Sequence, residues 1–594
     1  MTLETSLDHL ENSQIVRRVG TASAAAESDL GAAYRFKHTL TQDAAYRSLP
    51  RRQREQIHRR VAECYEQLFA TRLDQYAAVL AFHYDEARDD EKALAYSLRA
   101  GEVAMTVYAT AEAGQHLDRA LRVVRRGTPA TTEQLVQLFG RRGRALELES
   151  RFEDALENYR AQELLAQECS DRALELAAVV AQTKLHSFIN TLYNPAAGRA
   201  LAEHALTLAE ALEDRRSEAE IYWSLMNQAR FEIGRLEEAV VFGERALAVA
   251  RAIGWKEQVA FILNDIADVY ADLGKMDQGA RNLHEAEELW RELGNQPMLA
   301  DSLSSAGLWR TMSGDFTGAI AANSESYEIS LRIQNVWGQA YSRGFRGMPR
   351  WNIGEYGAAI SDFEAGAALA DEAGFLIGQI LPRIELALLY HELGASKLGL
   401  TLAEHAYQVV GQQVPAFASF VLSALAFFHL VAGDEAEAER HFAQLEQPDP
   451  AHGIFAFQFT SSVRILKAMH REQFDDASVY AERHLDDMRK YGLNTFVADI
   501  MLMRARALRH LGRVDEARTQ LEIARDLAAS IGQRRILWQI LPHLADLTAD
   551  PAEAAAMRED AAAIMADICA QLPTEELRAC FLALPVVRRT LATS

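Results

Sequence analysis

The sequence contains few cysteines, few prolines and no long apolar runs. Its four cysteines, Cys64, Cys169, Cys569 and Cys580, form no Cys-x-x-Cys pair, and their spacing fits neither a zinc site nor a disulfide framework. A reducing cytoplasm is therefore the expected location. No apolar run approaches the roughly 20 residues that a membrane-spanning helix needs, and the N-terminus lacks the pattern of a signal peptide. We expect a cytoplasmic protein without membrane contact.

Motifs for catalysis and cofactor binding are also missing. The chain contains no Gly-x-x-x-x-Gly-Lys-Ser/Thr loop, which would hold a nucleotide phosphate, and no nucleophile elbow. His391 and Glu392 begin like a zinc-peptidase motif, but Ala395 stands where the second histidine is needed. We therefore predict that the protein is not an enzyme, and that it has no catalytic residues, no metal site and no cofactor.

Composition and charge point to an acidic, helical protein. Hydrophobic residues make up 49% of the chain and prolines number only 13, which favours helix over strand. The formal net charge is -22, so the surface as a whole repels a phosphate backbone and nucleic acid is an unfavourable partner. Residues 1–60 are the exception, with ten Lys and Arg against seven Asp and Glu.

A motif that begins with glycine recurs along the middle of the chain. Five glycines are spaced by 40 residues, and each is followed five positions later by Ala or Gly: Gly234, Gly274, Gly314, Gly354 and Gly394. The series continues at Gly433 and Gly512, while Ser150 and Glu472 stand in the same place without glycine. Glycine ends a helix readily in a left-handed conformation, and acidic residues after it suit the first turn of the next helix.

A second terminator divides each repeat into two helices. Gly254, Gly294 and Gly374 follow 20 residues after a turn glycine, and Asn335 lies near the equivalent place. Small or medium residues also recur seven positions before the turn glycines, which lets the two helices of a repeat approach closely. We predict antiparallel helix pairs, about 24 helices in all.

The turn motif and the paired small residues resemble the tetratricopeptide repeat. The period of 40 resembles the longer-helix variant in bacterial ATPase-coupled regulators such as the maltose-type activators. This resemblance implies an all-α fold, a right-handed α-solenoid of tetratricopeptide-like helix pairs. We predict that the repeat array spans residues 61–545, that capping helices follow at 546–594, and that residues 1–60 form a winged-helix remnant with a linker helix.

Both ends of the chain add to this resemblance. Residues 34–62 are similar to the end of the winged-helix module in bacterial signal-transduction ATPases, which implies a helix over 3–19 and a β-wing over 20–37. Residues 572–588 are similar to the closing segment of the same proteins. The resemblance implies the sensor or regulatory half of an ATPase- or adenylate-cyclase-coupled signalling protein that lacks the ATPase core.

The segment from Arg47 to Arg60 holds six arginines and one glutamate. One interpretation is contact with phosphate or nucleic acid, and the other is a solvated helix face that also meets the acidic array. The first would make the protein a transcription regulator whose N-terminal winged-helix segment contacts DNA. The second, which we favour, fits a non-catalytic scaffold that binds a protein or peptide in the concave groove of the array.

The residues expected in the groove also predict one kind of partner that the protein does not bind. Tetratricopeptide domains that bind a C-terminal carboxylate use Lys and Asn at fixed places on the first helix of each repeat. Aligned on the turn glycine, those places hold Asn264, Asp265 and Asp268 in one repeat. Because these acids repel a carboxylate, we predict that the protein does not bind acidic peptide tails.

The most unusual stretch lies in the repeat that ends at Gly354. Arg343, Arg346 and Arg350 occupy positions that are usually apolar, and their spacing places them on one helical face. We predict a cluster that also includes Arg310 and Arg383 from neighbouring repeats, flanked by aromatic residues. The aromatic members are Trp309, Tyr341 and Trp351.

Buried arginines need partners, and two kinds remain open. The first is a set of internal salt bridges to nearby acids, and the second is a small anionic ligand. The candidate acids are Glu325, Asp362, Glu364 and Glu385. A separate ATPase or cyclase module is a further expected partner.

Overall fold

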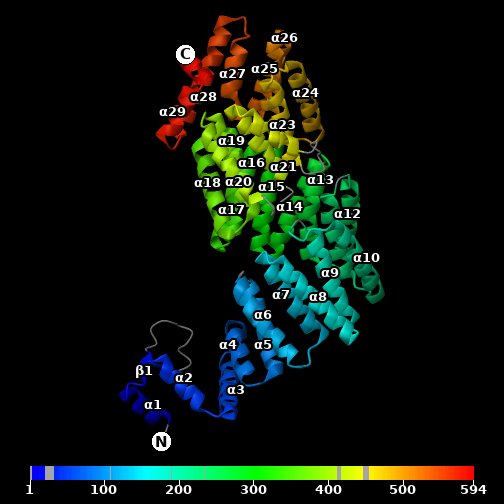
Figure 1. The fold of residues 1–594 in the computed structure, drawn as a ribbon, viewed down its shortest axis with the longest axis vertical. Helices are drawn as coiled ribbons and strands as arrows, with labels where there is room; N and C mark the ends of the chain where they lie inside the picture. The colour runs from blue at the N-terminus through cyan, green and yellow to red at the C-terminus, as the bar shows by residue number, and fades with distance from the viewer. Residues whose placement is uncertain are drawn as a thin grey trace. The chain divides into compact units, whose positions relative to one another are not determined.

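The computed structural model describes residues 3–19, 33–106, 109–188, 190–232, 234–410, 417–445 and 454–593. The described residues form helices almost throughout, as Figure 1 shows. The chain divides into two compact units, Met1–Gln182 and Thr183–Ser594, and the boundary lies within helix α9 (Arg172–Ser187).

The first unit consists of one small sheet and eight complete helices among its described residues. In chain order the elements are α1 (Leu3–Asn12), β1 (Val16–Val19), β2 (Ala33–Phe36), α2 (Thr39–Ser48), α3 (Arg51–Leu68), α4 (Leu73–Glu86), α5 (Asp90–Thr106), α6 (Thr110–Arg125), α7 (Thr132–Leu148) and α8 (Phe152–Cys169). Consecutive helices from α3 onward pack against each other, around a core that includes Leu80, Leu94 and Leu117.

The N-terminal segment departs from the prediction. The helix predicted over 3–19 ends at Asn12. Strand β1 follows in its place because Gln14 adopts a left-handed conformation and the strand begins and ends with valine. Strand β1 pairs antiparallel with β2, with Val16 opposite Phe36. Part of the predicted wing, residues 20–32, lies outside the described residues.

The second unit holds the remaining helices. They are α10 (Pro195–Leu212), α11 (Arg215–Arg230), α12 (Leu236–Ala252), α13 (Lys256–Asp272), α14 (Met276–Leu293), α15 (Gln296–Ser313), α16 (Phe316–Arg332), α17 (Val336–Ile353), α18 (Tyr356–Ala373), α19 (Leu376–Glu392), α20 (Ser396–Val410), α21 (Ala418–Ala432), α22 (Glu435–Gln444), α23 (Ile454–His470), α24 (Phe474–Lys490), α25 (Val497–His510), α26 (Val514–Ser530), α27 (Arg534–Ala545), α28 (Pro551–Gln571), α29 (Glu575–Ala583) and α30 (Pro585–Thr593). Among the described residues, α4 to α27 lie within 61–545, which matches the predicted number of about 24.

The predicted turns separate the helices as the sequence indicates. Each turn glycine from Gly234 to Gly512 has a positive φ, and so do the second terminators Gly254, Gly294 and Gly374. Where glycine is missing, Ser150 and Glu472 take the same left-handed conformation at φ 57° and 58°. The packing of the repeat therefore imposes the left-handed conformation even on residues other than glycine, for which this conformation is unfavourable.

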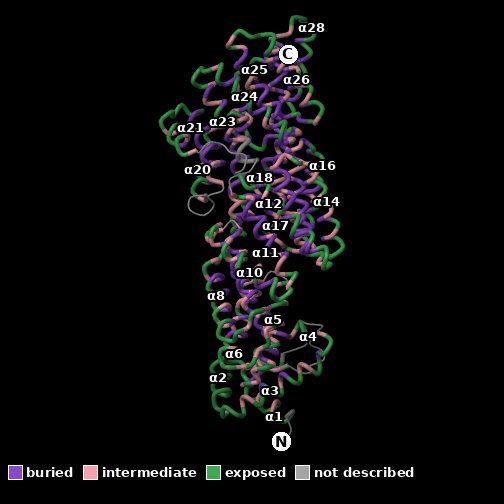
Figure 2. The backbone as a smooth tube through the Cα atoms, turned by 90° about the vertical axis from the view of Figure 1, so that its right-hand side faces the viewer, coloured by how far each residue is buried: buried purple, intermediate pink, exposed green. Residues whose placement is uncertain are grey.

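Small residues allow the two helices of a repeat to touch. A Cβ atom added at Gly279 in α14 would lie 2.8 Å from the carbonyl oxygen of Ala267 in α13, and one at Gly347 would clash with the ring of Phe363. These close approaches bury side chains along the centre of the helix layers, while many residues at the helix ends stay exposed (Figure 2).

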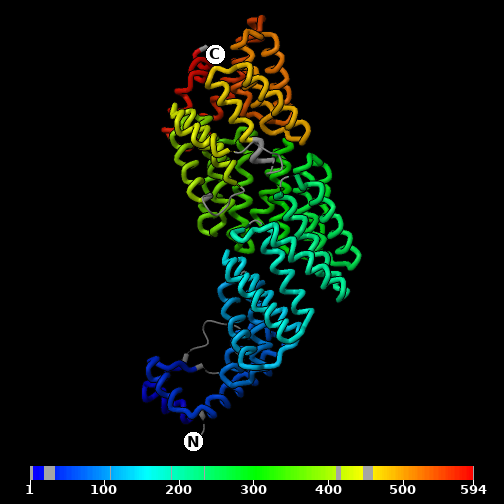
Figure 3. The backbone as a smooth tube through the Cα atoms, turned by 45° about the vertical axis from the view of Figure 1, so that its right-hand side comes forward, coloured from blue at the N-terminus to red at the C-terminus, as the bar shows by residue number. Residues whose placement is uncertain are grey.

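The C-terminal helices of the second unit fold back onto the turns of the middle repeats. The backbone N–H of Asn494 donates to the carbonyl of Met312 at 2.9 Å, and the Gln571 side chain donates to the carbonyl of Gly354 at 3.1 Å. Figure 3 shows these late helices beside the middle of the unit. A Cβ at Gly274 would lie 2.6 Å from the carbonyl oxygen of Lys490, so this contact needs glycine.

A buried ion pair anchors the fold-back. The Arg535 side chain is 3% exposed, and it donates to Glu392 of α19 and Asp499 of α25 at 2.5 Å each. Its guanidinium also stacks 4.6 Å from the ring centroid of Trp351 in α17. One residue of α27 thus joins three earlier helices, and these contacts give a buried cation the partners that it needs.

None of the described helices combines the length and the apolar composition that crossing a bilayer requires.

Candidate binding face of the first helices

The first helices of the repeats present one recurring face. Positions 13, 9 and 6 before each turn glycine are separated by four and three residues, so they share one side of the helix. In α13 these positions are Phe261, Asp265 and Asp268, and in α15 they are Asp301, Ser305 and Leu308. In α17 they are Tyr341, Phe345 and Met348, and in α19 they are Leu381, Glu385 and Leu388. We call this surface the first-helix face.

An acidic track with tryptophans runs along this face from α11 to α15. The indole N–H of Trp223 donates to Asp265 at 2.7 Å, and that of Trp309 donates to Asp268 at 2.7 Å. Arg230 forms salt bridges with Asp268 and Asp272 at 2.7 and 3.0 Å. Arg230 thus pairs with two of the carboxylates, and the Lys184 ammonium lies 5.5 Å from the ring centroid of Trp223.

Two carboxyl groups of the track hold their protons unusually tightly. Burial raises the pKa of Asp265 to about 6, against hydrogen bonds from Trp223 and Asn227 that lower it. Burial, followed by the charges of Asp265 and Asp268, raises the pKa of Asp301 to about 7. A cation placed here would favour the ionised form of both carboxyl groups and offset the repulsion between them, so the track is suited to positive charge.

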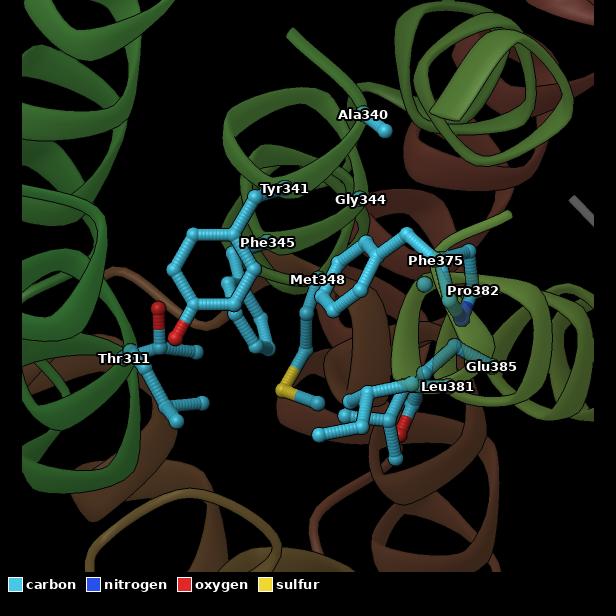
Figure 4. A pocket seen from close by; sticks show the side chains of 13 residues that line it. Thr311, Ala340, Tyr341, Gly344, Phe345, Met348, Phe375, Leu381, Pro382 and Glu385 are labelled. Carbon is cyan, nitrogen blue, oxygen red and sulfur yellow. The ribbon is translucent and has the colours of Figure 1, made fainter. Parts of the chain in front are cut away.

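An apolar cavity adjoins the track between the first helices α15, α17 and α19. Its volume is about 20 Å³, which is room for about one water molecule, and its walls are almost wholly apolar. The lining residues include Leu308, Tyr341, Phe345, Met348, Phe375 and Leu381. Figure 4 shows Tyr341 and Thr311 on one side, with Leu381 and Glu385 on the other.

Glu385 is the polar exception in this cavity. The residue is 5% exposed, and among the described residues its Oε2 has no hydrogen-bond partner. Burial raises its pKa to about 8, although the charge of Arg535 lowers it. A buried oxygen without a partner costs free energy, and the raised pKa reflects this, because burial favours the neutral, protonated form of the carboxyl group.

The arginines predicted as a site lie elsewhere, and three of the five converge on one acid. Asp362 of α18, whose side chain is fully buried, accepts from Arg343 at 3.0 Å and from Arg350 at 2.7 Å. It also accepts a two-pronged contact from Arg346, at 2.8 Å to each oxygen. Tyr327 lies under the guanidinium groups of Arg343 and Arg346. These contacts match the internal salt bridges that the sequence left open.

The other predicted site residues have separate contacts. Arg310 donates to the carbonyl of Gly318, and Arg383 pairs with Asp371 at 2.5 Å. Trp309 belongs to the acidic track and Tyr341 lines the cavity, whereas Trp351 is buried beneath Arg535. The structure therefore distributes the eight predicted residues over several places, and an anionic ligand for the arginines stays a prediction that none of these contacts requires.

The basic N-terminal helix is partly neutralised within the first unit. Arg51 pairs with Glu55 at 2.8 Å, and Arg59 pairs with Asp89 of the loop before α5 at 3.0 Å. Arg54 stacks over the ring of Tyr46. These contacts favour the interpretation of a solvated face that meets acidic helices.

Comparison with known proteins agrees with the repeat geometry. Residues 258–332, which cover α13 to α16, match the family model described as tetratricopeptide repeat. No curated protein matches the sequence. The chain is similar in structure to Cut9–Hcn1 of the APC/C at 13% identity and a TM-score of 0.45, covering 91% of this chain and 96% of that one. Yeast Tom70 is similar at 12% identity and a TM-score of 0.29, covering 78% and 96%. The fold is all-α and built of helix pairs, and residues 258–332 carry the tetratricopeptide match.

Proposed function

We propose that the protein is a non-catalytic scaffold that binds a protein segment on its first-helix face. The carrying observation is the acidic and aromatic track that continues from α11 to the cavity at α19. Repeat arrays bind partners along extended faces of this kind, because each repeat adds one more set of side chains in register.

We further propose that this scaffold is the sensor or regulatory part of an ATPase- or cyclase-coupled signalling protein in the cytoplasm. The resemblance of residues 34–62 and 572–588 to such proteins supports this assignment. The four cysteines are unpaired in the structure, which fits a reducing compartment.

A peptide selection tests the binding role. A random 12-residue display library is selected on the full chain, and the enriched peptides are measured against two variants that make the same change in charge. Asp301→Lys places the change on the first-helix face, while Glu372→Lys places it at an exposed position of α18. We expect affinity for Asp301→Lys to fall at least tenfold and affinity for Glu372→Lys to stay unchanged.

The proposal fails if no peptide is enriched, or if both variants bind the enriched peptides as well as the natural chain does. It also fails if both lose affinity equally, because the effect would then not depend on the first-helix face.

A further inference from the structure

A chain of four polar side chains joins the N-terminal segment to the helix pair α3 and α4. The segment consists of α1, β1, β2 and α2, in which α1 contacts β1 and β2 contacts α2. Figure 1 shows α2 leading from this segment into α3. Among the described residues, every hydrogen bond and ring contact from α2 to α3 or α4 is made by Tyr46. None of the ten residues of α2 is buried, so its attachment to the pair depends on this side chain, apart from the connecting residues 49–50.

The hydrogen bonds of this chain run in one direction. The Tyr46 hydroxyl donates to Oε2 of Glu86 at 3.3 Å, so its oxygen accepts from Nε2 of His58 at 3.0 Å. His58 then carries its proton on Nε2, and its Nδ1 accepts from Nδ1 of His83 at 2.8 Å. This is the one assignment that makes all three bonds, because the hydroxyl has a single proton and the carboxylate has none.

The two histidines share one proton between their Nδ1 atoms, and there is no place for a second. One added proton can go to Nε2 of His83, which leaves the bond between the rings intact. The next must go to Nδ1 of His58, where it removes the acceptor and sets two N–H groups against each other at 2.8 Å. The docked pair therefore takes up at most one added proton, whereas two separated imidazoles take up two.

The surroundings of the pair oppose even the first added proton. Burial lowers the pKa of His58, which is 7% exposed, and burial followed by the charge of His58 lowers the pKa of His83. Glu86 of α4 raises the pKa of both rings, Arg54 of α3 lowers that of His58, and Tyr46 is the titratable group from α2. Both pKa values stay below the ordinary value of 6.5, so separated histidines bind more protons than the docked pair as the pH falls below 6.5.

We propose that this chain of four side chains is an acid-sensitive latch on α2. Protonation of its two histidines separates Tyr46 from His58 and releases α2, together with α1, β1 and β2, from the helix pair. Each proton taken up on release shifts the docking equilibrium by up to about tenfold per pH unit. A ten-residue helix without buried residues is marginal by itself in water, so α2 unwinds when it is released. This inference is independent of the first-helix face and of any partner bound there.

Hydrogen exchange of the full chain, read by mass spectrometry at pH 7.5 and 5.5, tests the latch. Each exchange rate is divided by the intrinsic rate at the same pH, which removes the ordinary effect of acid on exchange. We expect the protection of amides 39–48 to fall at least about tenfold between the two pH values, while that of α4 stays constant. Equal protection of α2 at both pH values overturns the proposal.

Two variants locate the response. His38 is the N-cap of α2, and its positive charge at the start of the helix would also weaken α2 in acid. We expect His38→Gln to keep the full response, so loss of the response in this variant overturns the latch. His58→Gln lacks the ring nitrogen whose protonation breaks the pair, so its α2 protection should change by less than about threefold. A full response in His58→Gln contradicts the proposal.

The proton positions give a second test that needs no change in the latch. With the histidines labelled in nitrogen-15 and the two rings assigned, the nitrogen shifts at pH 7.5 should show His58 protonated on Nε2 and His83 on Nδ1. Two rings with the same tautomer overturn the hydrogen-bond chain, even where His58→Gln does not fold. EDTA should leave the shifts and the protection of α2 unchanged. A loss of protection with EDTA would mean that a metal ion, rather than a proton, joins the two rings, and the latch would be wrong.

Discussion

The two faces of helix α17 differ in whether the titratable groups packed there have partners. Toward α18 it directs three arginines, and all of them share one fully buried aspartate, Asp362. Toward α19 it lines an apolar cavity in which Glu385 keeps an oxygen without a hydrogen-bond partner among the described residues. On the first face the fold supplies a partner for each charged side chain. On the second, burial raises the pKa of Glu385, and one of its oxygens has no partner among the described residues. The more conspicuous cluster is therefore the one that has internal partners.

The largest effect is expected from removing Asp362, the shared partner of the three arginines. Asp362→Asn would leave three arginines around a neutral amide, and losing one partner of a buried ionic network costs about 3–5 kcal/mol. We expect faster hydrogen exchange across α17 and α18 and a lower melting temperature. Exchange rates equal to those of the natural chain would show that the arginines do not depend on this acid.

The next effect concerns Glu385 and depends on pH. Its folded-state pKa of about 8 is raised above the unfolded value, so its contribution to stability is fully present below the unfolded pKa and is lost as the pH rises through 8. Glu385→Gln removes this loss, while the nearby Arg535 remains in both proteins. We expect the variant to melt like the natural chain at pH 5, apart from a constant offset, and to gain on the order of 4 kcal/mol relative to it by pH 9.

Melting scans of both proteins at pH 5, 7 and 9 measure this gain. Glu372→Gln, at an exposed position of α18, serves as the control and should follow the natural chain at every pH. A constant difference between Glu385→Gln and the natural chain across the range would contradict the interpretation of the second face.

A smaller effect is expected from single arginine replacements, which rank Arg346 and Arg343 by their contribution to stability. Arg346 makes both prongs of its contact with Asp362 and also reaches Ser324, whereas Arg343 makes one contact with that acid. Burial lowers the pKa of Arg346, but Asp362 more than offsets this and raises it. We expect Arg346→Leu to cost about 1–2 kcal/mol and Arg343→Leu to cost less. Chemical denaturation of the two variants side by side decides the order.

The smallest effect is expected at Glu355, the exposed acid next to the arginine cluster. Glu355 lies 3.7 Å from Arg350 and its side chain is 52% exposed, so solvent screens the pair. We expect Glu355→Gln to change stability by less than about 1 kcal/mol. A cost near that of Asp362→Asn would mean that the cluster extends to the surface.

The sequence predicted the repeats well because their physical causes are local. A glycine at a fixed place ends a helix, and the small residues around it allow the pair to close, so both signals lie within a few residues of what they determine. The same applies to Arg343, Arg346 and Arg350, whose common face follows from helical spacing alone. The extra arginines predicted to join them, Arg310 and Arg383, belong to other helices, and each meets a nearer acceptor.

The partner of the arginines and the cavity could not be predicted in the same way. Four acids were plausible partners, and the choice of Asp362 depends on how α18 is rotated against α17. Glu385 was among those four candidates, yet it lines the cavity instead. One signal was available: Glu385 stands nine positions before its turn glycine, as Asp265 does, so both acids occupy the same place in their repeats.

The fold-back of the second unit has a consequence for how this array assembles. In an open array each repeat touches only its neighbours, and the ends can fray one repeat at a time. Here Gly274 and Gly354 touch residues more than 180 positions later, such as Lys490 and Gln571. During synthesis the middle repeats can therefore complete their contacts only after the end of the chain has been made. We infer that the second unit unfolds as one cooperative block. We also infer that it folds more slowly than an open repeat array of equal length, in which only neighbouring repeats touch.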